Sequence, residues 1–165
     1  MSRTLAAIVV FVALCGAATA QGPQWIEEFT ERPEEWGGDI HYAILDMPNR
    51  QALQVGCVRN RIEKVLVVFP QDRGVPAPLA PEPQVRYAFD NEDLQTTDWP
   101  LFEVGSIQVP RGGESSRITR RIATASRLVV QATTPDGTWV TADFDLAGNE
   151  RVIPKMLEAC GIPLT

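Results

Sequence analysis

A hairpin signal in the last third of the chain constrains the fold more than any other feature. Two runs of apolar and β-branched residues, 127–133 and 139–146, flank the sequence TPDGT, which has Asp136 and Gly137 at its centre. An Asp-Gly pair favours the tight turn between two antiparallel strands, because glycine adopts positive φ angles without a steric penalty. One face of the second run consists of Val140, Ala142, Phe144 and Leu146. This stretch therefore predicts two neighbouring antiparallel strands with one buried face.

Helical spacing is found on both sides of this hairpin. Before it, Ile118, Ile122 and Ala125 follow one another at a spacing that is typical of one apolar stripe on a short helix. After Gly148, the apolar side chains again follow a helical period and predict a terminal helix that ends near Cys160. The expected buried side of that helix consists of Ile153, Met156, Leu157 and Cys160.

Further strands are expected upstream of these elements. Alternation or continuous apolar runs mark the ranges 39–47, 52–58, 63–70, 84–90, 101–104 and 106–109. In the first range we take Ile40, Tyr42 and Ile44 as the apolar face, which places His41 on the opposite side. A proline-rich link over 70–83 is expected to be an extended surface loop, since proline fits neither a helix interior nor a central strand. The chain is therefore predicted to be mainly β, an antiparallel β-sandwich of about seven or eight strands with two short helices, one of them C-terminal.

The first residues have the features of a secretory signal peptide. Arg3 precedes an apolar run over 5–14, and small residues that end at Ala20 form the expected cleavage site. Lipidation at Cys15 is the less favoured alternative, because Leu14 rather than a small residue precedes that cysteine. We therefore expect Cys15 to be removed when the signal peptide is cleaved.

This interpretation divides the chain into three parts. They are a signal peptide over residues 1–20, an acidic lead-in over 21–39 and a single β-rich exported domain over 40–165. No later stretch contains the roughly 18 apolar residues that a transmembrane helix needs. We therefore expect a periplasmic protein without a transmembrane segment, with the extracellular space as the alternative location.

Two cysteines remain after the expected signal, Cys57 and Cys160. Export to an oxidising compartment favours their pairing as a disulfide. Such a bond closes a loop of about a hundred residues and stabilises the fold by up to ~4.7 kcal/mol, because it restricts the unfolded chain. The alternative is a pair of buried free thiols.

The most distinctive charge pattern is a group of arginines around the first expected helix. The group consists of Arg111, Arg117, Arg120, Arg121 and Arg127. On the helix, Arg117, Arg120 and Arg121 share the side away from the apolar stripe, and guanidinium groups suit phosphates and carboxylates. This side is a candidate contact for an anionic partner, and the alternative is a solvated helix face. The whole chain has 15 basic and 21 acidic side chains and a net charge of −6, which argues against a nucleic-acid partner.

Sequence signatures of catalysis are missing from the chain. It contains no phosphate-binding loop, no dinucleotide-binding glycine motif, no paired metal-binding histidines and no nucleophile elbow. The remaining candidates are the one histidine, His41, the pair Asp143 and Asp145, and the turn residues Asp90, Glu92 and Asp93. We interpret the pair as a solvated strand face and the turn acids as residues that bond to their own backbone. We therefore predict a protein that is not an enzyme and that has no metal ion or cofactor.

Several segments together resemble a known family of exported bacterial proteins. They are ALQVGC, EKVLVVF, VRYAFDNED, Trp99 and the stretch from RIATAS to EACG, which together span about residues 52–161. They look like the accessory proteins associated with type VI secretion, the VasI or TagO-like group, whose domain runs from a cysteine-bearing strand to an F-D-L-x-G strand end and a helix that closes on cysteine. The matching positions here are Phe144, Asp145, Leu146, Gly148 and Cys160. A looser similarity reaches the invasion-associated locus B proteins, which are small periplasmic β-rich domains.

The resemblance implies an accessory role rather than catalysis. We expect a non-enzymatic exported envelope accessory or binding protein, with association to a secretion system as the narrower form of this hypothesis. One alternative is a periplasmic inhibitor that binds a basic envelope enzyme such as lysozyme, because opposite charges steer association. A second alternative is an envelope hydrolase. The expected partner is a protein or another component of the cell envelope, and the sequence leaves the oligomeric state open.

Overall fold

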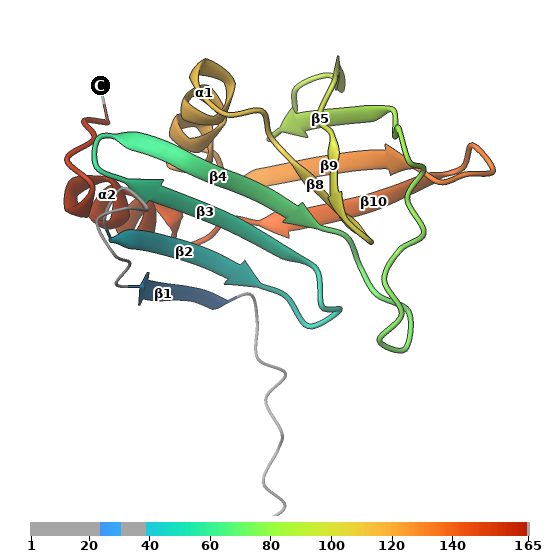
Figure 1. Cartoon of the computed structure of the whole chain (residues 1–165), viewed down its shortest axis with the longest axis horizontal. Helices are drawn as coiled ribbons and strands as arrows, with labels where there is room; N and C mark the ends of the chain where they lie inside the picture. The colour runs from blue at the N-terminus through green and yellow to red at the C-terminus, as the bar shows by residue number, and fades with distance from the viewer. Residues whose placement is uncertain (1–23, 31–38, 165) are drawn as a thin grey trace, which may run out of the picture.

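The computed structural model describes residues 24–30 and 39–164. In this part of the chain, two antiparallel sheets are stacked face to face, and two helices lie toward one end of the stack (Figure 1). The predicted signal peptide and most of the predicted acidic lead-in lie outside the described residues. The predicted fold class is confirmed: the protein is mainly β, with two antiparallel sheets and two helices, of which one is C-terminal.

The larger sheet has six strands in the order β1-β2-β3-β4-β8-β7, and the smaller sheet has four in the order β10-β9-β5-β6. The strands of the larger sheet are β1 (Gln24–Thr30), β2 (Ile40–Asp46), β3 (Ala52–Val58), β4 (Arg61–Val68), β8 (Ser106–Gln108) and β7 (Leu101–Glu103). Those of the smaller sheet are β10 (Trp139–Asp145), β9 (Arg127–Thr133), β5 (Val85–Phe89) and β6 (Gln95–Thr97). The helices are α1 (Gly113–Ile122) and α2 (Asn149–Ala159).

The described residues contain more strands than the sequence predicted. Strands β7 and β8 lie within the predicted ranges 101–104 and 106–109, whereas β6 was not predicted, because its three residues are too few for alternation to stand out. Strand β1 lies within the predicted lead-in, and its sequence QWIEEFT places glutamates on both faces. Strand β1 is an edge strand that pairs only with β2, and an edge position tolerates such polar side chains.

The inner faces of the two sheets form one hydrophobic core. Its largest fully buried side chains include Trp99, Phe69, Phe89 and Phe144. In the predicted hairpin, β9 and β10 pair over their whole length, and Gly137 takes φ +82° in the turn. Ile118 and Ile122 of α1 and Ile153 and Leu157 of α2 are also buried, as their helical spacing predicted. In the part of the chain that is described, neither helix is long and apolar enough to span a membrane.

The predicted face assignment of β2 is wrong. His41 stands directly opposite Cys57, and residues opposite each other in a ladder share a face, so His41 lies on the inner side with Ala43 and Leu45. Ala43 and Leu45 are fully buried. Apolar side chains occupy both faces of β2, so alternation alone does not choose the inner one. The choice is made by pairing with the buried face of β3.

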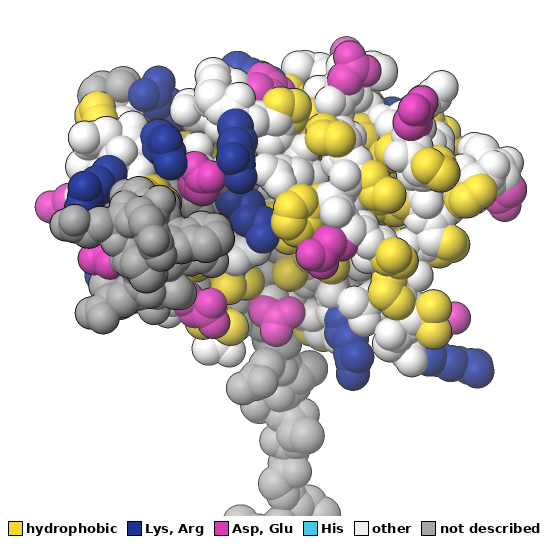
Figure 2. All heavy atoms as spheres, in the orientation of Figure 1, with side chains coloured by type: hydrophobic (Ala, Val, Ile, Leu, Met, Phe, Trp, Pro, Cys, Tyr) yellow, Lys and Arg dark blue, Asp and Glu magenta, His cyan; other side chains and the backbone are white. Residues whose placement is uncertain are grey.

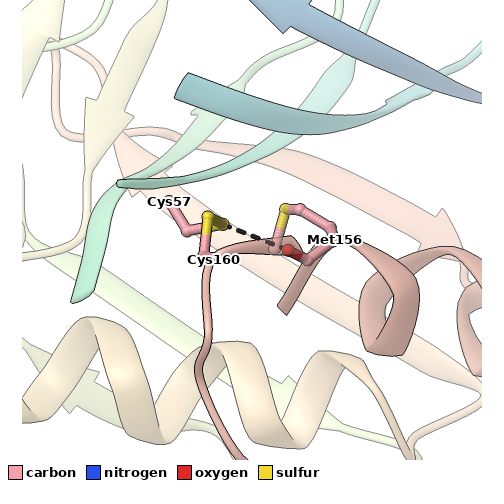
Figure 3. Close-up of a disulfide and its surroundings, with 3 residues drawn as sticks. All are labelled: Cys57, Met156 and Cys160. Carbon is pink, nitrogen blue, oxygen red and sulfur yellow. Dashed lines mark hydrogen bonds between the residues drawn. A yellow bond between two sulfur atoms is a disulfide. The ribbon is translucent and has the colours of Figure 1, made fainter. Parts of the chain in front are cut away.

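Cys57 and Cys160 form the predicted disulfide and join the middle of the chain to the end of α2 (Figure 3). Their Cα atoms are 6.1 Å apart, and 103 positions separate them in the sequence. The backbone N–H of Asn60 donates to the carbonyl of Cys160 at 2.7 Å, which adds a second link at the same place. The Cys57 sulfur also lies 3.4 Å from the carbonyl oxygen of Met156, a contact without a donated hydrogen because this sulfur is bonded to Cys160. Disulfides of this kind are typical of proteins in oxidising compartments.

Candidate functional site

Two of the three arginines proposed for anion binding are engaged with acceptors of the same chain. Arg117 forms an ion pair with Glu114 at 2.8 Å and donates to the Tyr87 hydroxyl at 2.5 Å. Hydrogen bonds to Glu114 and Tyr87 raise the pKa of Arg117 above its usual range. Arg121 pairs with Glu92 at 2.7 Å. An anionic partner of this face would have to compete with these contacts.

The other arginines of the group show the same pattern. Arg111 pairs with Glu63 at 3.0 Å, and Arg127 pairs with Asp143. Arg120 is exposed and forms no ion pair with any described residue. On the face drawn in Figure 2, acidic side chains lie among the basic ones. The contacts of the group agree best with a solvated, internally neutralised helix face.

The carboxylates considered for catalysis also have structural roles. Arg127 donates to both carboxylate oxygens of Asp143, at 2.8 and 2.5 Å, and this lowers the pKa of Asp143. A glycosidase-type general acid needs a raised pKa, so Asp143 is unsuited to that role. Asp145 stands on the same strand face, as predicted, and accepts a hydrogen bond from the backbone of Ala147 at 3.0 Å.

The turn after β5 is held together by Asp90. Its Oδ1 atom accepts hydrogen bonds from the hydroxyl and backbone N–H of Ser126, both at 2.8 Å, and from the backbone N–H of Arg127 at 3.1 Å. These bonds, above all the one from the Ser126 hydroxyl, lower the pKa of Asp90. This carboxylate fixes the β5 turn against the start of β9. The prediction that the turn acids bond to their own backbone does not describe Asp90, because its donors lie 36 and 37 positions away in the sequence. Within the described chain, no cluster of three or more metal-binding side chains is found.

His41 lines a pocket of about 230 Å³ beside α2. The same pocket is lined by Glu27 of β1 and Lys155 of α2, whose side chains pair at 2.5 Å. This ion pair links the C-terminal helix to the edge of the larger sheet. The pocket is smaller than the roughly 300 to 1,000 Å³ that is usual for ligand sites.

A larger groove, of about 640 Å³, opens where β5 and β6 separate. It is lined by residues 81–84, which lead into β5, and by residues 96–101, which run from the end of β6 to β7. We call it the fork groove. The start of β5 lies at the right of Figure 1, at the opposite end of the molecule from α2.

Proline explains why the ladder between β5 and β6 stops and the groove begins. The last pair is Val85 with Thr97, and the same register would next place Gln84 opposite Asp98 and Pro83 opposite Trp99. Residues 81, 83 and 100 are all prolines, which lack the N–H group that a ladder needs. The two chain segments therefore diverge and no longer pair with each other.

Both walls of the fork groove are anchored to the sandwich. On one wall, Gln84 exchanges hydrogen bonds with Thr133 of β9: its N–H donates to the Thr133 hydroxyl at 2.9 Å, and its carbonyl accepts from the Thr133 N–H at 3.1 Å. On the other wall, the Pro100 carbonyl accepts from the N–H of Gln108 in β8 at 3.0 Å. The prolines restrict the walls further, because they fix φ. The groove is thus a preformed feature of the fold.

Trp99 lines the groove and joins it to the core. Its ring is 1% exposed and stacks on Tyr87 with the ring centroids 4.8 Å apart and an interplanar angle of 15°. Its indole Nε1 is one of three buried side-chain polar atoms in the described residues that have no hydrogen-bond partner. Leaving a buried donor unpaired costs about 1 to 3 kcal/mol, so an acceptor at this position would be stabilising.

Sequence reasoning did not identify the fork groove. Its elements were visible as a proline-rich link and as Trp99, but their proximity depends on the register between β5 and β6. Prolines on both sides of a predicted strand pair, just beyond its last paired residues, are the signal that points to such a fork. Comparison of the chain with protein-family models, with curated proteins and with solved structures found no match.

Proposed function

We propose that this protein is an exported, non-enzymatic binding protein of the cell envelope, and that the fork groove holds a segment of a partner polypeptide. The observation that carries the proposal is the groove itself, preformed between two chain segments that diverge beyond the β5–β6 ladder, with the carbonyls of Pro81 and Pro83 open to a donor. Its volume of about 640 Å³ falls within the range of known ligand sites. The disulfide supports an oxidising location, for which we propose the periplasm.

The resemblance to accessory proteins of type VI secretion supports one particular setting for this binding protein. In that setting the partner is a component of the secretion apparatus or of the envelope around it. The motif positions Phe144, Leu146 and Cys160 are buried and serve the fold, so the resemblance bears on architecture more than on the groove.

Display of random dodecapeptides against the folded, disulfide-bonded protein tests the proposal. We expect enrichment of peptides that bind the unaltered chain and lose binding to Gln84→Trp, because Gln84 is exposed and lines the groove. Gln24→Trp is the matched control, since Gln24 is also exposed but lies on the edge strand β1 of the other sheet. Failure to enrich any peptide with this pattern would overturn the groove as a binding site.

A separate assay addresses the non-enzymatic part of the proposal. We expect no release of products from peptidoglycan fragments by the purified protein. Hydrolysis that disappears in Asp143→Ala or Asp145→Ala would instead favour an envelope hydrolase. The Arg127→Ala variant controls for loss of the ion pair, because it disrupts the contact of Asp143 while both carboxylates remain.

Inhibition of a basic envelope enzyme such as lysozyme is the second candidate function. The net charge of −6 favours it, because opposite charge accelerates association. At low salt we expect lysozyme to lose activity as the protein is added and to regain it as salt is raised. Unchanged lysozyme activity with excess protein at low salt removes this candidate.

A further inference from the structure

The lining of the fork groove offers more hydrogen-bond acceptors than donors. Pro81, Pro83 and Pro100 contribute carbonyl groups but no N–H groups. The Pro100 carbonyl already accepts from Gln108, whereas no backbone bond in the described chain reaches the carbonyls of Pro81 and Pro83. A ligand that donates hydrogen bonds therefore suits this lining.

The charged side chains of the lining also favour a ligand that donates hydrogen bonds. They are Glu82 and Asp98, both exposed, and no lysine or arginine lines the groove. Neither carboxylate forms an ion pair with any described residue, whereas Glu63, Glu92 and Glu114 each hold an arginine. The groove thus presents two uncompensated negative charges in a protein whose other acids are often paired.

The groove also has apolar surface. Trp99, Pro83 and Leu101 line it, and such surface suits the aliphatic stem of a long basic side chain. The indole N–H of Trp99 has no hydrogen-bond partner among the described residues, but the atom is buried, so a ligand in the groove does not reach it unless the ring moves. A basic residue in an extended segment has both matching parts: charged donors at its tip and an apolar stem.

We infer that the fork groove selects a partner segment by a lysine or arginine, whose charged group is held by Glu82 and Asp98 while its aliphatic stem lies on the apolar lining. The inference rests on the proposed function, because it specifies the segment that the groove holds. A neutral or acidic segment leaves the two carboxylates and the proline carbonyls without donors and is disfavoured.

Peptides enriched by display supply the probes for the test. We expect each to contain lysine or arginine, and exchange of its arginine for citrulline, which is neutral and nearly isosteric, should weaken binding about tenfold or more. The double variant Glu82→Gln/Asp98→Asn should weaken the arginine peptide to a similar extent and change the citrulline peptide little. The matched control is Glu150→Gln/Glu158→Gln on α2, which removes the same charge from exposed positions outside the groove.

The indole N–H resonance of Trp99 gives a local readout, assigned by its loss in Trp99→Phe. Addition of the arginine peptide should shift this resonance, while the other tryptophan indoles respond less. Equal affinities of the arginine and citrulline peptides, or an equal loss in the α2 control, would overturn the inference and leave the groove as a neutral peptide site. Absence of enriched peptides would instead overturn the proposed function.

Discussion

The side-chain amide of Gln51 pairs with the backbone of Asp143 as a neighbouring strand would. Its Nε2 donates to the Asp143 carbonyl at 2.5 Å, and its Oε1 accepts from the Asp143 N–H at 3.3 Å. Gln51 precedes β3 in the larger sheet, and Asp143 lies on β10, the edge strand of the smaller one. The amide therefore joins the two sheets and covers part of an edge that would otherwise be open to another chain.

Replacement of Gln51 by alanine should destabilise the fold, because the amide is buried and two backbone groups of Asp143 lose their partner. We expect the free energy of unfolding to fall by about 1 to 3 kcal/mol, measured by urea denaturation. Gln54→Ala is the control, because Gln54 is half-buried on the outer face of β3 and should change stability little. Equal losses in the two variants would show that the amide pairing contributes nothing specific.

The two sides of the smaller sheet, at β10 and at β6, thus differ in structure. At β10, a buried side chain imitates a strand and covers part of the edge. At β6, three prolines stop the ladder and leave the fork groove open. Open edges of sheets attract other chains, so the covered part of the β10 edge is closed to them, whereas the groove beyond the β5–β6 ladder stays available to a partner.

The disulfide should contribute a large share of stability. Its 103-residue separation gives up to ~4.7 kcal/mol in the loop-entropy treatment, so the Cys57→Ala/Cys160→Ala variant should unfold at clearly lower urea concentration. The unaltered chain from Gln21 onward should show no free thiols when unfolded without a reducing agent. Two reactive thiols in that titration would contradict the bond.

Much of the fold could be predicted from local sequence, but pairing decided the rest. The β9–β10 hairpin followed from Asp136 and Gly137, and the disulfide followed from the cysteine count and the predicted export. The inner face of β2 did not follow, because Tyr42 and Leu45 are both large and apolar while only the register with β3 distinguishes their faces. The local hydrophobic pattern therefore specifies where strands occur, whereas the face of a strand that is buried depends on the distant strand with which it pairs.

The candidate site was less predictable than the fold for the same reason. The arginines of α1 stood out in the sequence, but two of their partners, the Glu92 carboxylate and the Tyr87 hydroxyl, come from β5 and its turn, far away along the chain. The groove arises from prolines at 83 and 100 that become neighbours only through the β5–β6 register. Sequence distance hides both relationships, since neither is encoded in a contiguous motif.

Acid should destabilise the turn held by Asp90. Hydrogen bonds from Ser126 lower the folded-state pKa of Asp90 below its ordinary value of 3.8, so the ionised form stabilises the fold above that pH. This contribution is lost as the pH falls from about 4 through the lowered pKa. Asp90→Asn should therefore show a smaller decrease in stability than the unaltered chain over this acid range.

Ser126→Ala provides the matched test for Asp90, because it removes the strongest of the three donors and leaves the carboxylate in place. Its Asp90 should titrate closer to 3.8, as followed by carboxyl carbon resonances. Asparagine is tolerated at φ +52°, the backbone angle of Asp90, so strain should not obscure the comparison. If stability falls with pH in both variants as it does in the unaltered chain, the Asp90 carboxylate is not the source of the acid destabilisation.

Tyr42 should limit what can replace Gly56 in the neighbouring strand. A Cβ atom at position 56 would lie 2.6 Å from Cε1 of Tyr42, which is closer than carbon atoms approach, so the ring has to move. We expect Gly56→Ala to lower the free energy of unfolding by about 1 to 3 kcal/mol. In a Tyr42→Ala background the same change should cost much less, and a double-mutant cycle by urea denaturation measures this coupling. Equal costs in the two backgrounds would mean that the ring moves aside freely and does not constrain the strand.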